Sequence, residues 1–126
     1  MYDIEERQDI ELLVDEFYKK VLADEVISHF FTDVVKLNWE KHMPIMYNFW
    51  SATLLGEDGY EGNPMHKHIT LNQKSPLESK HFDRWIRLWK NTVQEFFVGP
   101  KADEAMLRAG QIAKLMLLNV QQSKTN

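Results

Sequence analysis

The spacing of the apolar residues limits how this chain can fold more than any other feature of its sequence. In four stretches these residues recur every three or four positions, which gathers them on one face of an α-helix. No stretch shows the convincing alternation of apolar and polar residues that a half-buried strand would have. The pattern predicts an all-α fold, with helices over residues 4–24, 38–56, 75–97 and 103–120.

Turn and capping residues indicate where these helices begin and end. Asn38 is a candidate N-cap of the second helix, and Gly56 is a candidate stop at its C-terminus. Ser75 and Pro76 suit the N-cap and the first position of the third helix. Pro44 lies several residues inside the second helix, where it removes one backbone hydrogen bond and should kink the first turns.

Size, charge and composition narrow the classes of protein to which this chain could belong. Its 126 residues fit a single domain, residues 1–126, and a 44% hydrophobic content is enough for a packed core. A net charge of −4 argues against broad electrostatic binding of nucleic acid or of an anionic membrane. The absence of cysteine excludes disulfides, thiolate catalysis and cysteine-ligated zinc or iron–sulfur clusters. Neither a signal sequence nor a membrane-spanning run is found, so we expect a cytoplasmic protein.

The stretch YEGNPMHKHITL, residues 60–71, carries two histidines, His66 and His68. A zinc site would need further ligands such as His42 and His81, but the spacing of these four histidines resembles no zinc motif. The apolar neighbours favour His68 on the inner side and His66 facing solvent. An inward histidine beside an aromatic-lined space suits an axial ligand of haem iron. On periodicity alone, a four-helix domain with a buried aromatic core and outward histidines is the simpler interpretation.

Five motifs, taken together, resemble the third group (the P type) of the truncated haemoglobins. They are EFYKKV, HFF, WEKHMPIMYNFWSATLLG, YEGNPMHKH and FDRWIRLW, in this order and at compatible spacing. The resemblance covers nearly the whole chain, from about Ile10 to Val120. It implies a truncated globin fold, in which two antiparallel helix pairs form a two-over-two sandwich around haem b (iron protoporphyrin IX).

The resemblance also implies which residues would hold the cofactor. His68, the last residue of MHKH, matches the histidine that binds the iron, which leaves His66 outside the site. Phe31 matches a phenylalanine that packs on the porphyrin after the first helix. Met46 matches a position of the distal pocket, and Phe49 and Trp50 match aromatic residues farther along the same face. The apolar members of this set would exclude water from the iron.

On the ligand side of the haem, the resemblance implies a polar cluster. Tyr18 and Trp85 match the distal tyrosine and tryptophan, whose O–H and indole N–H would donate hydrogen bonds to a bound ligand. Dioxygen becomes partly negative when it binds ferrous iron, so such donors stabilise it selectively. His42 matches the distal-histidine position, where it is either a gate to solvent, which we favour, or a third polar contact.

Three functions are compatible with these residues. The first is a haem protein that reversibly binds dioxygen and other diatomic ligands, such as nitric oxide and carbon monoxide. The second is a haem enzyme for nitric oxide dioxygenation or peroxide reduction, which would need an unidentified reductase as partner. The third is a cofactor-free helical interaction module. The first is our main prediction, because Tyr18 and Trp85 suit slow ligand release but do not themselves supply electrons.

Overall fold

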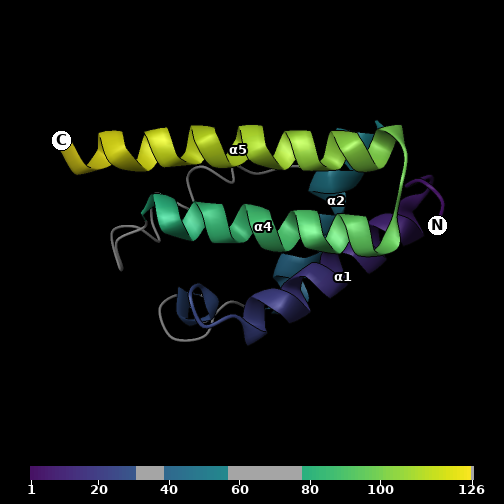
Figure 1. Cartoon of the computed structure of the whole chain (residues 1–126), viewed down its shortest axis with the longest axis horizontal. Coiled ribbons are helices and arrows are strands. Elements are labelled where there is room, and N and C mark those ends of the chain that lie inside the picture. The colour runs from purple at the N-terminus through teal and green to yellow at the C-terminus, as the bar shows by residue number, and fades with distance from the viewer. Residues whose placement is uncertain (31–38, 57–77, 126) are drawn as a thin grey trace.

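A computed structural model describes residues 1–30, 39–56 and 78–125 of the chain (Figure 1). The described part is helical, with one isolated bridge between Tyr2 and Phe97, so the predicted all-α fold is confirmed. Four helices are placed in the described part: α1 (Arg7–Ala23), α2 (Trp39–Leu55), α4 (Ser79–Phe96) and α5 (Pro100–Thr125).

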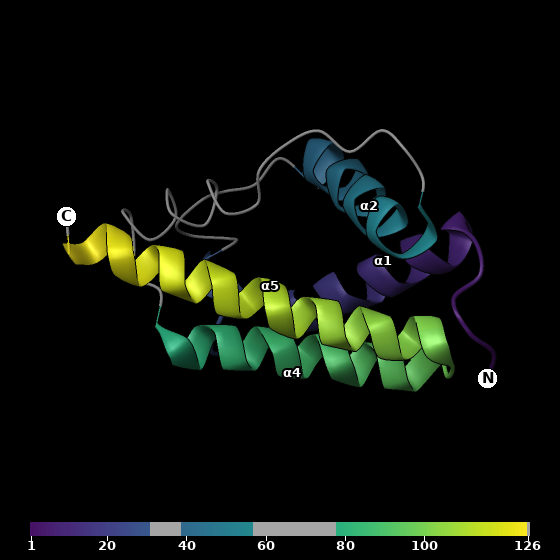
Figure 2. The same cartoon turned by 90° about the horizontal axis from the view of Figure 1, so that it is seen from above.

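The helices are arranged around α1. Figures 1 and 2 show α4 and α5 side by side as an antiparallel pair, joined by a short connection. α1 packs against α4 on one side and against α2 on the other, and α2 also touches α5. In Figure 2, α2 lies on the opposite side of the molecule from α4. All four helices contribute buried side chains to the core, and those of α5 are mostly alanines.

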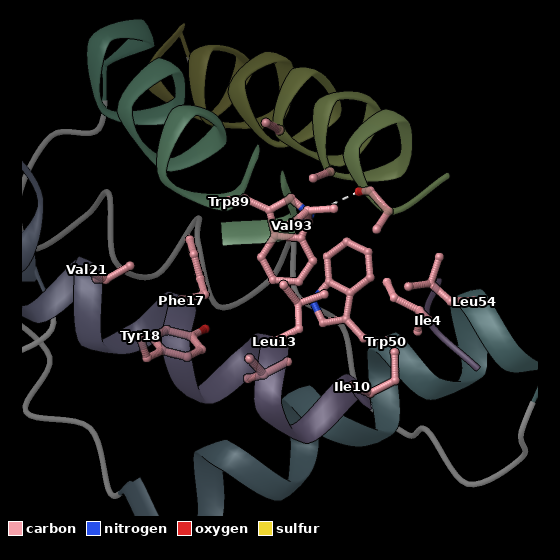
Figure 3. Close-up of a cluster of buried hydrophobic side chains, with 14 of the residues drawn as sticks. Ile4, Ile10, Leu13, Phe17, Tyr18, Val21, Trp50, Leu54, Trp89 and Val93 are labelled. Atoms are coloured by element: carbon pink, nitrogen blue, oxygen red, sulfur yellow. Dashed lines mark hydrogen bonds between the residues drawn. The ribbon is translucent and has the colours of Figure 1, made fainter. Parts of the chain in front are cut away.

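The centre of this core is a cluster of stacked aromatic rings (Figure 3). Trp50 of α2 stacks on Trp89 of α4, with ring centroids 4.3 Å apart and an interplanar angle of 20°. Phe17 of α1 meets Trp89 edge-on at 5.1 Å. Offset stacks and edge contacts at these distances are the favoured geometries of aromatic pairs. Leu13 and Val93 are fully buried beside them, so three helices share one apolar centre.

A stripe of alanines lets α5 approach α4 closely. Ala102, Ala105, Ala109 and Ala113 recur at three and four positions, and each is almost completely buried. Small side chains on this face bring the α5 backbone near enough for Trp89 to donate its indole N–H to the carbonyl oxygen of Ala105 at 3.0 Å. This hydrogen bond gives the polar end of a buried tryptophan a partner, which such a residue usually requires.

The N-terminal residues close one end of the helix pair. The Asp3 carboxylate accepts hydrogen bonds from the backbone N–H groups of Lys101 and Ala102, at 2.9 and 2.8 Å. These are first-turn N–H groups of α5, which have no partner inside the helix. Gly99 lies directly beneath Asp3 with a φ of 142°, a value that strongly favours glycine. Residues far apart in the sequence thus cap α5 together.

The observed end of α2 agrees with the prediction from sequence, and the observed start of α4 does not. α2 ends at Leu55 and Gly56 follows with a φ of 70°, as predicted for a C-terminal stop. The predicted start of α4 at Ser75 and Pro76 is wrong, because its N-cap is Glu78. The backbone N–H of Glu78 donates to Nδ1 of His81 at 2.9 Å, a capping contact that a search for serine or proline overlooks.

The first helix also begins later than expected, at Arg7 rather than near residue 4. Its start is set by Asp9, whose carboxylate accepts hydrogen bonds from the backbone N–H groups of Glu5 and Glu6 at 2.9 and 3.1 Å. α2 continues through Pro44, which is exposed. Asn38, the predicted cap of α2, lies outside the described residues.

The apolar residues of α2 are divided between the core and its edge. Of Met46, Phe49 and Trp50, Trp50 is fully buried, together with Ser51 and Leu54. Met46 and Phe49 are only half-buried at the edge of the core. The physical reason is that α2 is apolar on two faces, and only one of them packs on α1 and α5.

Candidate functional site

Tyr18 and His42 form a polar pair between α1 and α2, which we call the distal pair. The phenol oxygen of Tyr18 lies 2.9 Å from Nε2 of His42. Tyr18 is 8% exposed and His42 is half-buried, so the pair lies near the edge of the core. A hydrogen bond between a buried phenol and an imidazole satisfies polar groups that burial would otherwise penalise.

The Tyr18 phenol is held in its neutral form. Burial raises the pKa of Tyr18 above its ordinary value, because an apolar environment disfavours the phenolate. A neutral phenol has one proton to donate and can also accept a hydrogen bond. If His42 donates its Nε2–H, the phenol proton is available to a third group; if His42 accepts, that proton is already used. The tautomer of His42 therefore decides what the phenol can bind.

A third ring, Trp39, touches both members of the distal pair. Its centroid lies 5.5 Å from that of Tyr18 and 5.6 Å from that of His42, in edge-to-face contacts. Tyr18 and His42 are themselves edge-to-face at 5.1 Å. No sequence motif indicated a role for Trp39. Its position three residues before His42, on the same face of α2, was the signal that could have identified it.

A surface groove of about 330 Å³ lies between α1 and α2, beside these three rings. Tyr18 and Trp39 line its inner side. The other lining residues are supplied by both helices and combine apolar side chains with charged ones: Leu12, Asp15, Glu16, Lys19, Leu22 and Met43. The groove therefore offers solvent an approach to the distal pair from the outer face of the two helices.

Trp85 of α4 is connected to the distal pair through the ring of Phe17, which contacts both Tyr18 and Trp85. The Phe17 ring meets Tyr18 edge-on at 5.0 Å and Trp85 edge-on at 5.9 Å. Trp85 is half-buried, and within the described ranges its indole N–H has no hydrogen-bond acceptor. Trp89, one turn later, uses its own indole N–H for the Ala105 carbonyl. Among the described residues, Trp89 thus has an acceptor for its indole N–H and Trp85 has none.

The remaining predicted site residues are found in three different situations. Met46 and Phe49 lie on the half-buried face of α2, next to His42. Trp50 lies in the core against Trp89. The predicted iron ligand His68 and the predicted porphyrin contact Phe31 lie outside the described residues, as does His66.

Tyr47, for which no sequence motif indicated a role, connects two helices. Its hydroxyl donates a hydrogen bond to the carboxylate of Asp15, which ties α2 to α1. Burial raises the pKa of Tyr47, and the hydrogen bond to Asp15 raises it further. Next to it, Arg7 donates from Nη2 to the side-chain oxygen of Asn48 at 2.7 Å. These contacts tie α2 to α1.

Two features are absent from the part of the chain that the structure describes. It contains no cluster of three or more histidine, cysteine, aspartate or glutamate side chains that could hold a metal ion by themselves. No helix among the described residues is long and apolar enough to cross a membrane.

Comparison with known proteins extends this description. The model of the bacterial-like globin family matches residues 2–118 of the chain. A group 3 truncated hemoglobin from Campylobacter jejuni is 28% identical over 110 residues, which cover 85% of this chain and 84% of that protein. A group 1 truncated hemoglobin from Synechocystis is 36% identical over 75 residues, covering 59% of this chain and 58% of that protein.

The fold has a counterpart among solved structures. The crystal structure of a group III truncated hemoglobin from Campylobacter jejuni superposes with a TM-score of 0.80. The aligned region covers 94% of each chain, and 24% of the aligned residues are identical. At this identity the likeness shows the fold alone.

Proposed function

Because this chain belongs to the bacterial-like globins and is a truncated haemoglobin of the third group, we propose that it binds dioxygen and other diatomic ligands beside Tyr18 and Trp85. Membership of the globin family implies haem as the cofactor. The observation that carries the proposal is the hydrogen-bonded distal pair at the edge of an apolar core. Apolar side chains at the edge of the core would serve packing alone, whereas the Tyr18 O–H and the His42 ring can donate hydrogen bonds.

The described residues fit a large, flat, apolar cofactor. Met46 and Phe49 of α2, and Trp85 and Ile86 of α4, are half-buried although all four are large and apolar. Covering such side chains stabilises a complex by roughly 25 cal/mol for each Å² of apolar surface removed from water. Two helices that each leave an apolar face partly open are suited to enclosing haem. When bound, haem would supply an iron centre with an open position for a diatomic ligand.

His68 is our candidate for the iron ligand, because a neutral imidazole binds iron through one nitrogen and can donate a hydrogen bond from the other. Phe31 is proposed to pack on the porphyrin. Both assignments stay predictions from the sequence. Trp50 is proposed to support the cofactor site indirectly. Its ring stacks on Trp89, and its centroid lies 5.1 Å from that of the half-buried Phe49, which it helps to hold in place.

On the ligand side, Tyr18 and Trp85 are proposed as hydrogen-bond donors. Each such bond to a strongly polarised ligand contributes roughly 1–3 kcal/mol in a site from which water is excluded. His42 is proposed to donate to the Tyr18 oxygen and so to leave the phenol proton for the ligand. The contact with Tyr18 supports this role of His42 as a third polar group, and its use as a gate to solvent stays a prediction.

The deciding experiment is haem binding by two matched histidine variants. We expect the purified protein to show a Soret absorption band, His68→Ala to lose haem or the spectroscopic signature of an axial nitrogen, and His66→Ala to retain both. Loss of haem from His66→Ala alone would mean that the iron ligand is misassigned. A complete absence of the Soret band after reconstitution with haem would instead favour the cofactor-free interaction module.

A second candidate function is nitric oxide dioxygenation or peroxide reduction. The distal pair favours it to the extent that donors near a bound ligand also assist its conversion. Both reactions need electrons from a reductase, which remains unidentified. Stopped-flow mixing of the oxygenated protein with nitric oxide separates the two functions: stoichiometric nitrate on the millisecond scale indicates dioxygenation, and simple displacement of dioxygen indicates ligand binding alone.

A further inference from the structure

We propose that Trp39 is a positioning residue for the distal pair: its indole ring holds the Tyr18 phenol and the His42 imidazole in hydrogen-bond contact and shields the His42 side of that contact from the surface groove. The proposal rests on the proposed function for its effect on ligands. Its structural part, the state of the His42 ring, can be tested in the protein without haem.

The first support is the geometry of the three rings. The centroid separations of Trp39–Tyr18, Trp39–His42 and Tyr18–His42 are 5.5, 5.6 and 5.1 Å, and all three contacts are edge-to-face. Each ring is thus braced by the other two. A hydrogen bond between two side chains that can rotate requires their rotation to be restricted, and an indole in contact with both rings restricts them without using either hydrogen-bonding atom of the pair.

The second support is the place of Trp39 in the helix. Trp39 is the first residue of α2, and His42 follows three residues later. Residues at this spacing lie on the same face of a helix, so their side chains meet. Tyr18 comes from α1, and its ring closes the triangle from the opposite helix. Trp39 therefore links the local geometry of α2 to the packing of α2 on α1.

The third support is the groove. Trp39 and Met43 line it from α2, and Leu12 and Leu22 line it from α1, with Tyr18 at the inner side. Leu12 and Leu22 are 41% and 42% exposed, so the groove is open to solvent. Tyr18 and Trp39 both line the groove, whereas His42 is not among the described residues that line it. Removing the indole would open a path for water to the His42 side of the Tyr18–His42 hydrogen bond, where water would compete for it.

The charges of the groove add to this argument. Asp15, Glu16 and Lys19 line it beside the apolar residues, and Lys19 pairs with Glu16 at 2.9 Å. Charged side chains at the rim keep water in the groove. Tyr18 itself borders this groove, and Trp39 is the lining residue that touches both Tyr18 and His42.

The test compares Trp39→Leu, Trp39→Met and Trp39→Phe with Met43→Ala, a control that changes the groove and leaves the three rings intact. In the haem-free protein, ¹⁵N NMR of the histidine rings, with His42 identified by its loss in His42→Gln, reports the tautomer. We expect one dominant His42 tautomer in the parent and in Met43→Ala, and a mixture in Trp39→Leu and Trp39→Met. Trp39→Phe should largely restore the parent state, because it keeps a ring.

In the haem-bound protein the same variants are measured for dioxygen release and for the stretching band of bound carbon monoxide. We expect Trp39→Leu to release dioxygen about five- to tenfold faster, as for the partial loss of one hydrogen bond, and to split or broaden the carbon monoxide band. An unchanged His42 tautomer in both Trp39→Leu and Trp39→Met overturns the proposal, as does an equal change in Met43→Ala.

If haem does not bind at all, the proposed function fails while the NMR result still decides the role of Trp39. Circular dichroism shows which variants are folded, and Trp39→Met decides if Trp39→Leu is not.

Discussion

The indole N–H of Trp89 donates to the carbonyl oxygen of Ala105 at 3.0 Å, whereas that of Trp85, one turn earlier on α4, meets no acceptor among the described residues. The two tryptophans share a helix, and both touch the ring of Phe17. Their difference is one of location: Trp89 is 1% exposed and faces α5, and Trp85 is half-buried. Trp89 joins α4 to α5 through its indole N–H, and Trp85 is the proposed ligand donor.

We therefore expect the same substitution to change ligand release at Trp85 and stability at Trp89. Trp85→Phe should raise the dioxygen release rate about tenfold, because the proposed donor is lost, and should change stability little. Trp89→Phe should leave release nearly unchanged but lower the free energy of unfolding by about 1–3 kcal/mol, because the Ala105 carbonyl loses its buried partner. Stopped-flow release and urea unfolding measure the two quantities. Identical release rates in Trp85→Phe and the parent would remove Trp85 from the site.

The distal tyrosine has its own matched control in Tyr47. Tyr18→Phe removes the phenol bound to His42, and Tyr47→Phe removes the phenol bound to Asp15. We expect Tyr18→Phe to accelerate dioxygen release about tenfold or more, and carbon monoxide release much less, because carbon monoxide is less polar when bound. Tyr47→Phe should affect stability and spare both release rates. Equal acceleration by the two variants would point to a general loosening of α1 against α2.

Asp24 predicts a specific loss of stability in acid. Burial is the largest single influence on Asp24 and by itself raises its pKa, but the hydrogen bond from Arg84 and those from the backbone N–H groups of Val26 and Ile27 together outweigh it. The pKa of folded Asp24 is therefore lowered. A lowered pKa contributes stability above the unfolded value, about 3.9, and that stability is lost as pH falls through the folded value.

We expect Asp24→Asn to lower the free energy of unfolding at pH 7 by about 1–3 kcal/mol, the range for a buried hydrogen bond to a charged group. The difference from the parent should shrink as the pH is lowered below about 4. Glu25→Gln, an exposed neighbour, serves as the control and should behave as the parent does. Urea unfolding from pH 7 to pH 3 measures the difference, and a gap that stays constant over this range would contradict the assignment.

Two glycines predict opposite effects of a single methyl group. A Cβ at Gly99 would lie 2.5 Å from Cγ of Asp3, and the φ of 142° is itself unfavourable for alanine. We expect Gly99→Ala to destabilise the protein by about 2 kcal/mol or more, because strain adds to the loss of the Asp3 cap on α5. Gly110 lies inside α5 with open space around it, so Gly110→Ala should stabilise by about 0.5–1 kcal/mol. Thermal unfolding compares the two, and a tolerated Gly99→Ala would disprove the close approach of Asp3.

Much of the fold follows from local sequence because a helix is a local structure. The predicted helices with apolar residues at three and four positions are present, and Phe17, Trp89 and Val93 on these stripes are buried. Gly56 ended α2 as predicted, because a positive φ suits glycine. The start of α4 was predicted wrongly, since Glu78 and His81 cap it through side-chain contacts that the usual capping residues do not signal.

The candidate site likewise combines residues identified from the sequence with contacts that only the structure shows. The identity of Tyr18, His42 and Trp85 as distal candidates came from a resemblance in sequence, and His68 and Phe31 remain predictions of that kind. The bond between Tyr18 and His42, and the role of Trp39 beside them, depend on how α2 crosses α1.

By itself the sequence determined that the chain forms helices, which residues make their apolar stripes, and the family to which it belongs. Only the tertiary structure decided which of the two apolar faces of α2 is buried, that Asp3 caps a helix beginning at Pro100, and which tryptophan keeps its donor free among the described residues. The physical reason is that periodicity reports what one helix has to bury. Which neighbour buries it depends on contacts between residues that lie far apart along the chain.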